Sequence, residues 1–381
     1  MDGTIAAIAT AVGEAAVGIV RLSGSEARHI GQGIFRVGER RGEVEFESHR
    51  VYYGSIVDPA TEEPLDEVLL TFMEGPRSYT REDVVEVGCH GGTLPLRRVL
   101  RAMLKAGARL AEPGEFTRRA FSNGRIDLAQ AEAVCDMIRA RSDAGATLAL
   151  KQLEGALSRE INRLRHQLLG SVAAIEASID FPEEDIEVSA RTPLAKDLTR
   201  VQCELEKILA RADEGRVMRE GIQTTIVGKP NVGKSSLLNA LLGQERAIVT
   251  PIAGTTRDLI EETVVAAGVA LVLTDTAGIH FTEDVVEQQG VDRARQALER
   301  SELLLVVLDD SQVVDEEDEA LLQLIGSQQA VILLNKSDLG RRRVDREWLG
   351  RKTGGTPKLE ISAHTGQGLE ELTELIGEIF G

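Results

Sequence analysis

Eight consecutive residues could bind phosphate: Gly228-Lys229-Pro230-Asn231-Val232-Gly233-Lys234-Ser235. They fit the pattern G-x-x-x-x-G-K-[ST], whose glycines let backbone N–H groups wrap phosphate oxygens. Lys234 is expected to reach the β- and γ-phosphates of a nucleotide, and the Ser235 hydroxyl suits Mg²⁺. A strand-like run precedes the pattern, and a helical run follows it. The helix N-terminus therefore adds a dipole that favours the phosphates. Ser236, which comes directly after the pattern, is also expected to bind the nucleotide.

Three later segments identify the nucleotide. Asp275-Thr276-Ala277-Gly278 follows an apolar run, so Asp275 is expected to hold Mg²⁺ through water and Gly278 to meet the γ-phosphate. Asn335-Lys336-Ser337-Asp338 follows another, and the Asp338 carboxylate can accept from the N1–H and 2-amino groups of guanine, a donor pair that adenine lacks. Ser362-Ala363 can supply a backbone N–H to the guanine O6. The order of these segments predicts a translation-factor-type G domain that binds GTP.

A switch segment is expected at residues 250–258, which contain Gly254-Thr255-Thr256. A threonine hydroxyl there reaches Mg²⁺ only when the γ-phosphate draws the loop in. Ile279 stands where Ras-like enzymes carry a water-orienting Gln shortly after the DTAG-type glycine. From the residues alone, any of three downstream acids could replace that Gln: Glu283, Asp284 and Glu287.

The source of positive charge for the transition state is also open. No arginine finger is evident, and Arg257 is a weak candidate. Asn231 offers an amide oxygen three residues before Lys234, so a K⁺ ion between the phosphates is an alternative of about equal weight.

The elements that must position these residues divide the chain into three parts. Residues 1–120 are expected to be α+β, with strands near 4–10, 17–22, 51–57, 68–72 and 84–87 and a helix over 94–105. Residues 121–215 show helical spacing, broken at 180–185 by Pro182. Residues 216–381 alternate strands at 224–227, 269–274, 303–308, 330–334 and 359–361 with helices. This order predicts a multidomain α/β protein that ends in a doubly wound sheet.

Composition excludes several classes. The chain has 381 residues and a net charge of −18, and residues 1–121, 122–215 and 216–381 carry −3, −5 and −10. Any nucleic-acid role must therefore use a local basic patch or a partner that supplies charge. The longest aliphatic run, 303–308, is too short to span a membrane, and no signal peptide is evident. Three widely spaced cysteines form no disulfide framework, which favours the cytoplasm.

Long strings of residues resemble the family of tRNA modification GTPases called MnmE or TrmE, and they run through the whole chain. They stand at 4–10, 17–24, 78–87, 90–92, 113–121, 127–133, 179–184, 247–250 and 254–258. The resemblance implies an N-terminal folate-binding, dimerising domain (1–120) of aminomethyltransferase type, a helical domain (121–215) and a G domain (216–381). It implies a potassium-stimulated GTPase that forms a homodimer.

The resemblance also implies a reaction. With an FAD-dependent partner (MnmG or GidA) in a heterotetramer, the family adds an aminomethyl or carboxymethylaminomethyl group to C5 of the wobble uridine of certain tRNAs. A folate such as 5-formyltetrahydrofolate supplies the carbon, and GTP hydrolysis drives a conformational cycle.

Roles follow for single residues by their motif positions. Glu287 would orient the attacking water beside Lys234, which resolves the choice among the three acids. Mg²⁺ would be bound by Ser235 and Thr256, and folate would contact Arg21, Glu86 and Arg125. The K⁺ ligands would be Asn231, Thr250, Ile252 and Thr255.

Three departures qualify the resemblance. The family usually has Lys at position 125, and it often has Arg where this chain has His280. It continues beyond the G domain with helices and a tail containing Cys-Ile-Gly-Lys, whereas this sequence ends at Gly381. The main alternative is therefore a GTP-dependent binding switch without modifying chemistry. A fragment that folds poorly is a third possibility.

Overall fold

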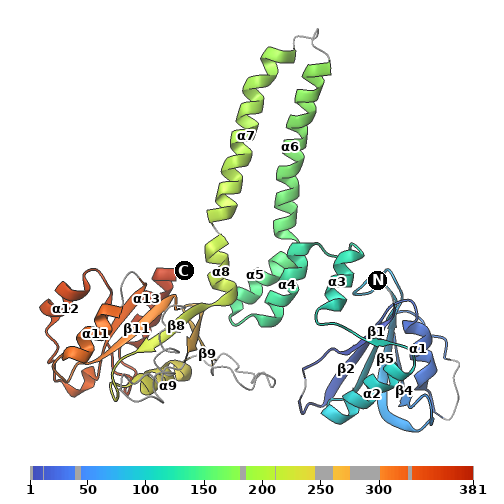
Figure 1. The fold of residues 1–381 in the computed structure, drawn as a ribbon, viewed down its shortest axis with the longest axis horizontal. Helices are drawn as coiled ribbons and strands as arrows, with labels where there is room; N and C mark the ends of the chain where they lie inside the picture. Colours follow the sequence, from blue (N-terminus) through green and yellow to red (C-terminus); the bar gives the residue numbers. More distant parts are fainter. Residues whose placement is uncertain are drawn as a thin grey trace, which may run out of the picture. The chain divides into compact units, whose positions relative to one another are not determined.

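The computed structural model describes residues 3–11, 13–38, 44–180, 186–210, 212–244, 261–274, 301–324 and 328–380 (Figure 1). The chain divides into two compact units, Met1–Val134 and Cys135–Gly381. Each unit is described below by itself. Among the described residues, no helix is long and apolar enough to cross a membrane.

The N-terminal unit is a seven-stranded sheet with helices packed on one face. Its strand order is β3-β4-β5-β6-β2-β1-β7, and every neighbouring pair is antiparallel except β1 and β7. The elements are β1 (Ile5–Ile8), β2 (Val17–Ser23), α1 (Ala27–Ile34), β3 (Phe35–Arg36), β4 (Arg50–Val57), β5 (Pro64–Met73), β6 (Val84–His90), α2 (Thr93–Lys105), β7 (Arg109–Leu110), α3 (Glu115–Ser122) and α4 (Leu128–Arg139), which crosses into the second unit. The expected strands and the expected helix are confirmed, with small shifts of their ends.

Alternation along the strands gives this sheet two different faces. Leu22, Val85 and Phe72 are paired neighbours on the face that packs against α1 and α2, where the core is buried. The residues between them form the other face, which we call the open face. There Val17, Val51, Tyr53 and Leu69 are exposed by 62%, 59%, 64% and 53%.

Helices α1 and α3 were missed by the sequence reasoning. Helix α1 contains Gly31 and Gly33, and glycine disfavours helices. The structure explains one of them, because a Cβ on Gly31 would lie 3.2 Å from Val85 Cγ2.

The second unit begins with helices that lead into a sheet. Its helical elements are α5 (Asp143–Leu153), α6 (Ala156–Asp180), α7 (Ile186–Ala210) and α8 (Ala212–Glu220). The single helix expected near 193–213 is therefore replaced by α7 and α8. Helix α8 packs on α5, where a Cβ on Gly145 would lie 2.6 Å from the Met218 carbonyl oxygen. Gly221, at a φ of 77°, is the only residue between α8 and the first strand of the sheet.

The sheet of this unit has the order β13-β12-β11-β8-β10-β9 and is parallel except for β9. Its elements are β8 (Ile222–Val227), α9 (Lys234–Gln244), β9 (Glu261–Ala266), β10 (Val269–Thr274), β11 (Leu303–Asp309), α11 (Glu316–Leu324), β12 (Ala330–Asn335), the 3₁₀ helix η1 (Ser337–Leu339), α12 (Arg346–Thr353), β13 (Lys358–Glu360) and α13 (Leu369–Phe380). Strand β9 was not expected. It forms a hairpin with β10 through Ala267-Gly268, both at positive φ, a pattern typical of a two-residue turn.

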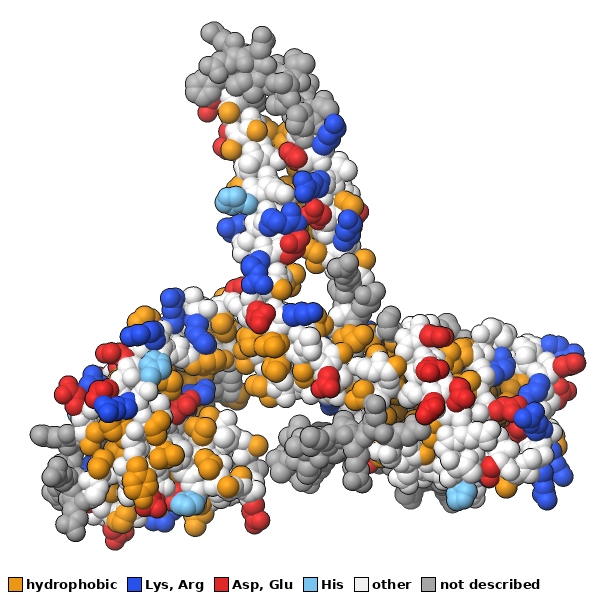
Figure 2. All heavy atoms as spheres, turned by 180° about the vertical axis from the view of Figure 1, so that it is seen from behind, with side chains coloured by type: hydrophobic (Ala, Val, Ile, Leu, Met, Phe, Trp, Pro, Cys, Tyr) orange, Lys and Arg blue, Asp and Glu red, His pale blue; other side chains and the backbone are white. Residues whose placement is uncertain are grey.

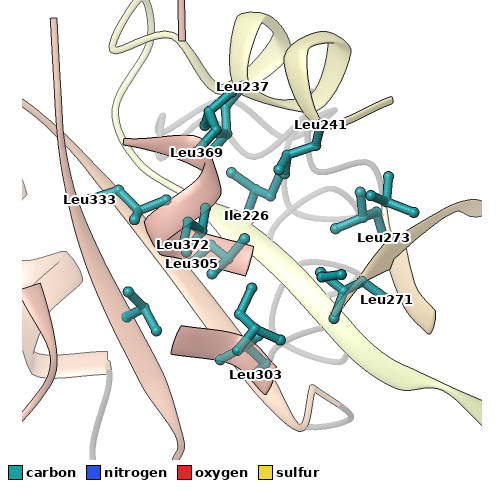
Figure 3. Packing of buried hydrophobic residues seen from close by; sticks show 14 of the residues in the cluster. Ile226, Leu237, Leu241, Leu271, Leu273, Leu303, Leu305, Leu333, Leu369 and Leu372 are labelled. Atoms are coloured by element: carbon teal, nitrogen blue, oxygen red, sulfur yellow. The ribbon is translucent and has the colours of Figure 1, made fainter. Parts of the chain in front are cut away.

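Helices cover both faces of this sheet, which confirms the doubly wound architecture. Figure 3 shows Leu237 and Leu241 of α9 and Leu369 and Leu372 of α13 packed over Leu305 and Leu333. Leu304, Val306 and Leu308 of β11 point to the opposite face, where they pack with Leu349 of α12. Strand β11 is buried along its whole length because apolar residues occupy both faces.

Candidate functional site: a guanine nucleotide site and a second polar cluster

The loop between β8 and α9 passes too close to its neighbours for larger residues. A Cβ on Gly228 would lie 2.5 Å from the Val307 carbonyl oxygen, and one on Gly233 would lie 2.2 Å from Asn335 Nδ2. Gly233 has a φ of 103°, and Asn231 has a φ of 62°. Glycine is therefore required at both pattern positions by local packing as well as by phosphate approach.

Lys234 lies inside this loop. Its Nζ donates to the carbonyl oxygens of Gly228 at 2.7 Å and Lys229 at 2.8 Å. Burial lowers the pKa of Lys234. A phosphate at this point would supply the negative charge that the described surroundings of Lys234 lack. The neighbouring Ser235, at the start of α9, is exposed, and no described residue is hydrogen-bonded to its hydroxyl, which leaves this oxygen available to Mg²⁺.

Asn335 connects three segments that are distant in the sequence. Its Nδ2 donates to the Val232 carbonyl at 2.7 Å, and its Oδ1 accepts from the Ala363 N–H at 2.9 Å. Asn335 is 2% exposed. One buried amide thus fixes the phosphate loop against the ends of β12 and β13, where a base would bind.

Lys336 connects the same loop to β11. Its Nζ donates to the Asn231 carbonyl at 2.9 Å and to Asp309 Oδ2 at 2.6 Å. Burial alone would raise the pKa of Asp309, but hydrogen bonds from Lys336 and Ser311 outweigh it and lower that pKa. Lys336 has a φ of 69°, an uncommon conformation for a residue other than glycine. The ion pair therefore holds two strained residues, Lys336 and Asn231, in contact.

Asp338 presents its carboxylate at the carboxyl edge of the sheet. Ser362, which is fully buried, donates its hydroxyl to Asp338 Oδ1 at 2.7 Å. Asp338 itself is exposed. The carboxylate is thus oriented by one hydrogen bond and still able to accept from a base.

A second cluster of polar and aromatic side chains lies in the N-terminal unit. Arg21 Nε donates to Glu86 Oε1 at 2.7 Å, on neighbouring strands of the open face. The Arg21 guanidinium lies 5.4 Å from the Tyr79 ring centroid and 5.6 Å from that of Phe116. Arg125 lies 4.8 Å from the same Tyr79 ring and donates to the Tyr79 carbonyl at 3.2 Å. Two guanidinium groups, one carboxylate and two aromatic rings thus share one site.

A buried ionic network holds α3 beside this cluster. Arg119, 1% exposed, donates to Glu115 Oε1 at 3.1 Å, to Glu82 Oε2 at 3.0 Å and to the Gly3 carbonyl at 2.9 Å. Arg109 Nη1 also donates to Glu115 Oε2 at 2.9 Å. Hydrogen bonds from Arg109, the Glu112 N–H and Arg119 lower the pKa of Glu115 to about 2, despite its burial. The network fixes the helix that carries Phe116.

Known proteins match both units of the chain. The family model described as "GTP-binding protein TrmE N-terminus" matches residues 4–125, and that of the "MnmE helical domain" matches residues 128–381. The tRNA modification GTPase MnmE of Heliobacterium modesticaldum is 52% identical over 98% of this chain and 80% of its own length. The chain belongs to the MnmE family of tRNA modification GTPases. It is therefore a GTP-hydrolysing enzyme.

Further MnmE proteins give the same result. Those of Desulforamulus reducens and Shouchella clausii are 48% and 49% identical over 99% of this chain and 82% of their own lengths. Among solved structures, Era of Aquifex aeolicus bound to GDP and AlF4⁻ is 32% identical over 40% of this chain and 55% of its own, with a TM-score of 0.33. The assignment to the MnmE family rests on the sequence relatives and not on this structural likeness.

The structure brings together the expected site residues that it describes. Around the phosphate loop it places Asn231, Val232, Gly233, Lys234, Ser235, Asn335, Lys336, Asp338, Ser362 and Ala363 at one edge of the sheet. Ser236 lies in the first turn of α9. The expected residues Thr250, Ile252, Thr255, Thr256, Asp275, Thr276, Ala277, Gly278 and Glu287 lie outside the described residues.

Three residues of these sites escaped the sequence reasoning. Tyr79 and Phe116 stand out in the sequence only as parts of longer strings. The contacts of Tyr79 with both arginines and of Phe116 with Arg21 depend on how distant segments fold onto the sheet. Asp309 follows directly on the apolar run 303–308. Its place as the last residue of β11, at the edge where parallel strands end, was a usable signal.

Proposed function

We propose that this MnmE family member is a potassium-stimulated GTPase that acts in tRNA modification. With an FAD-dependent partner, it adds an aminomethyl or carboxymethylaminomethyl group to C5 of the wobble uridine of certain tRNAs. The names of its relatives as tRNA modification GTPases carry this proposal. The reaction takes place in the cytoplasm, in keeping with three free cysteines, Cys89, Cys135 and Cys203.

In the G domain, the residues have separate tasks. The Asp338 carboxylate selects guanine, and Lys234 and Ser235 bind the phosphates and Mg²⁺, with Thr256 as the second protein ligand and Glu287 orienting water. Asn231 suits K⁺ because its backbone carbonyl is held by Lys336, while no described residue is hydrogen-bonded to its side-chain amide. The amide oxygen is therefore free to bind a cation beside the phosphates.

In the N-terminal unit, the Arg21, Glu86 and Arg125 cluster suits a folate. A carboxylate can accept from the amino and ring N–H groups of a pterin, and a guanidinium can pair with the glutamate tail. Arg21 and Arg125 already lie over the Tyr79 ring, which supplies an aromatic surface for a flat ring system. Bound folate would supply the one-carbon unit, and these side chains would orient it.

The open face of the N-terminal sheet is suited to a homodimer. Its exposed apolar residues are Val17, Val51, Tyr53 and Leu69, and Figure 2 shows hydrophobic side chains gathered over this unit. An apolar face of this kind can pair with itself about a two-fold axis. Arg21 and Glu86 lie on the same face, so the dimer would bring two folate sites close to its interface.

The decisive experiment compares GTP hydrolysis in K⁺ and in Na⁺ at equal ionic strength. We expect a higher rate in K⁺, and we expect Asn231→Ala to abolish the difference. Equal low rates in both salts would refute the potassium mechanism.

Binding of 5-formyltetrahydrofolate distinguishes this function from a GTP-dependent switch. We expect binding that is weakened by Glu86→Gln and retained in Glu67→Gln, a matched change on the same face of the sheet. A chain that hydrolyses GTP but binds no folate would favour the switch.

A further inference from the structure

The outer face of α2 carries a group of exposed arginines. The helix buries Leu96, Val99, Ala102 and Met103 against the sheet. Its exposed side presents Arg97, Arg98 and Arg101; Arg101 lies four residues after Arg97 and three after Arg98, so all three lie on one side of the helix. Among the described residues, no carboxylate pairs with these three side chains. The fourth basic residue of the helix, Lys105, pairs with Asp58 at 2.7 Å.

Two arginines on other helices, Arg163 and Arg346, are by contrast paired with acids. Arg163 of α6 pairs with Glu160 at 2.6 Å and also with Glu204. Arg346 of α12 pairs with Asp310 at 2.6 Å and with Glu360 at 2.9 Å. Like charges three or four residues apart destabilise a helix, so α2 by itself has an unfavourable charge pattern. A bound anion would offset the repulsion among these arginines.

The net charge of the segment around α2 has the opposite sign to that of the chain. Residues 91–111 contain five basic and no acidic side chains, whereas residues 1–121 as a whole carry a net charge of −3 and the chain −18. A polyanion that approaches such a protein needs a local cationic surface. Helix α2 provides one on the unit that also holds the Arg21 and Glu86 cluster.

We propose that the outer face of α2 binds the phosphate backbone of tRNA; the inference rests on the proposed function. From Arg97 to Lys105 the helix rises about 12 Å, so its cations can contact more than one phosphate. Arginine suits this task because its planar guanidinium forms paired hydrogen bonds with phosphate oxygens. Contacts with phosphates do not depend on the base sequence of the RNA, so this face would position the tRNA without reading its bases. Because α2 covers the side of the sheet opposite the open face, it stays accessible in the proposed homodimer.

A second basic segment supplies a matched control. Residues 340–358 contain seven basic and two acidic side chains, and Arg341, Arg343 and Arg351 are exposed. Acidic residues lie closer to this segment than to the arginines of α2. Arg342 pairs with Glu360 at 2.8 Å, and Lys352 approaches Glu319 of the acidic helix α11 to 3.4 Å. An equal loss of positive charge there should matter less to RNA.

The test compares two triple variants of the full chain, R97Q/R98Q/R101Q and R341Q/R343Q/R351Q. Glutamine keeps the helix propensity close to that of arginine. Binding of fluorescently labelled tRNA is measured by anisotropy between 50 and 200 mM salt, and circular dichroism checks folding. We expect the α2 variant to bind at least about tenfold more weakly at low salt and to lose about 2 units from the slope of log K against log salt, because each lost phosphate contact removes about 0.7–0.9. The control should stay within about twofold of the wild type.

Several results would overturn the inference. They are unchanged tRNA binding by the α2 variant, an equal loss in the control, or no tRNA binding by the wild type at low salt. Retained tRNA binding with loss of the FAD-dependent partner would assign the face to a protein. None of these outcomes decides the proposed function, which is judged by the K⁺ and folate assays.

Discussion

Replacing Asp309 with Asn should weaken guanine nucleotide binding while leaving the fold intact. Asp309 is expected to act on the nucleotide through Lys336 and not by direct contact. It holds the Lys336 ammonium at 2.6 Å, and Lys336 in turn holds the Asn231 carbonyl of the phosphate loop. Asparagine has nearly the same shape and still offers an oxygen, but it lacks the charge that fixes the lysine.

The size of the effect follows from the exposure of the pair. The side chains of Lys336 and Asp309 are 31% and 5% exposed, so the ion pair is only partly screened by water. A hydrogen bond between charged groups contributes about 1.5–3 kcal/mol and a neutral one about 0.5–1.5 kcal/mol. The loss of charge should therefore cost about 1–1.5 kcal/mol of nucleotide binding. This corresponds to a Kd for GDP that rises about 5- to 12-fold.

Fluorescence titration with a labelled GDP measures this Kd, and stopped-flow measures the dissociation rate, which should rise by a similar factor. Asp315→Asn is the matched control. Asp315 binds Lys229 at 2.6 Å, but Lys229 keeps Asp318 at 2.7 Å when Asp315 is neutralised, so the Kd should change less than about twofold. An Asp309→Asn variant with wild-type Kd would refute the role of the pair, as would an equal loss in the control.

Three further changes probe other contacts. Gly233→Ala should weaken GDP binding at least about 100-fold, measured by calorimetry, because its Cβ would lie 2.2 Å from Asn335 Nδ2. Gly243→Ala is the control and should leave the affinity unchanged, because its Cβ would have no neighbour within 4 Å. Equal affinities of the two variants for GDP would contradict the packing argument. The Glu115 carboxylate, with its pKa lowered to about 2, should stabilise the N-terminal unit by roughly 3 kcal/mol above pH 4.5. The stability difference between the wild type and Glu115→Gln, measured by hydrogen exchange of α3, should therefore fall as the pH drops towards 2. A difference that does not change with pH would refute the role of the ionised carboxylate. Tyr79→Leu should weaken 5-formyltetrahydrofolate binding about tenfold without changing GTP hydrolysis, since the ring holds Arg21 and Arg125; unchanged binding would remove the ring from the site.

The nucleotide site was predictable because its chemistry is local in sequence. Each motif stands directly after an apolar strand, and parallel strands bring their carboxyl ends to one edge. Asn335 and Asp338 therefore fall where the sequence suggests. The hydrogen bonds that Asn335 makes with Val232 and Ala363 were not predictable, because they depend on how three distant segments meet.

The second cluster shows a different limit. Arg21 and Glu86 pair because β2 and β6 are neighbours in one register, which strand periodicity alone does not specify. Helix α1 was not predicted because its two glycines lower the helix propensity of the segment, whereas tertiary packing stabilises the helix. Tyr79 gains its importance from two arginines that lie 58 and 46 residues away in sequence.

The connection through Gly221 has a mechanical consequence. Val217 of α8 belongs to the core of the nucleotide-binding sheet, and one residue separates α8 from β8, whose other end is the phosphate loop. An excised domain that began at β8 would lose part of its own core, so the smallest useful fragment for nucleotide studies begins before α8. Over its nine residues α8 rises about 13 Å. Because only one residue connects them, a shift of β8 during the GTP cycle would also displace α8. Since α8 packs on α5, the displacement would reach α5.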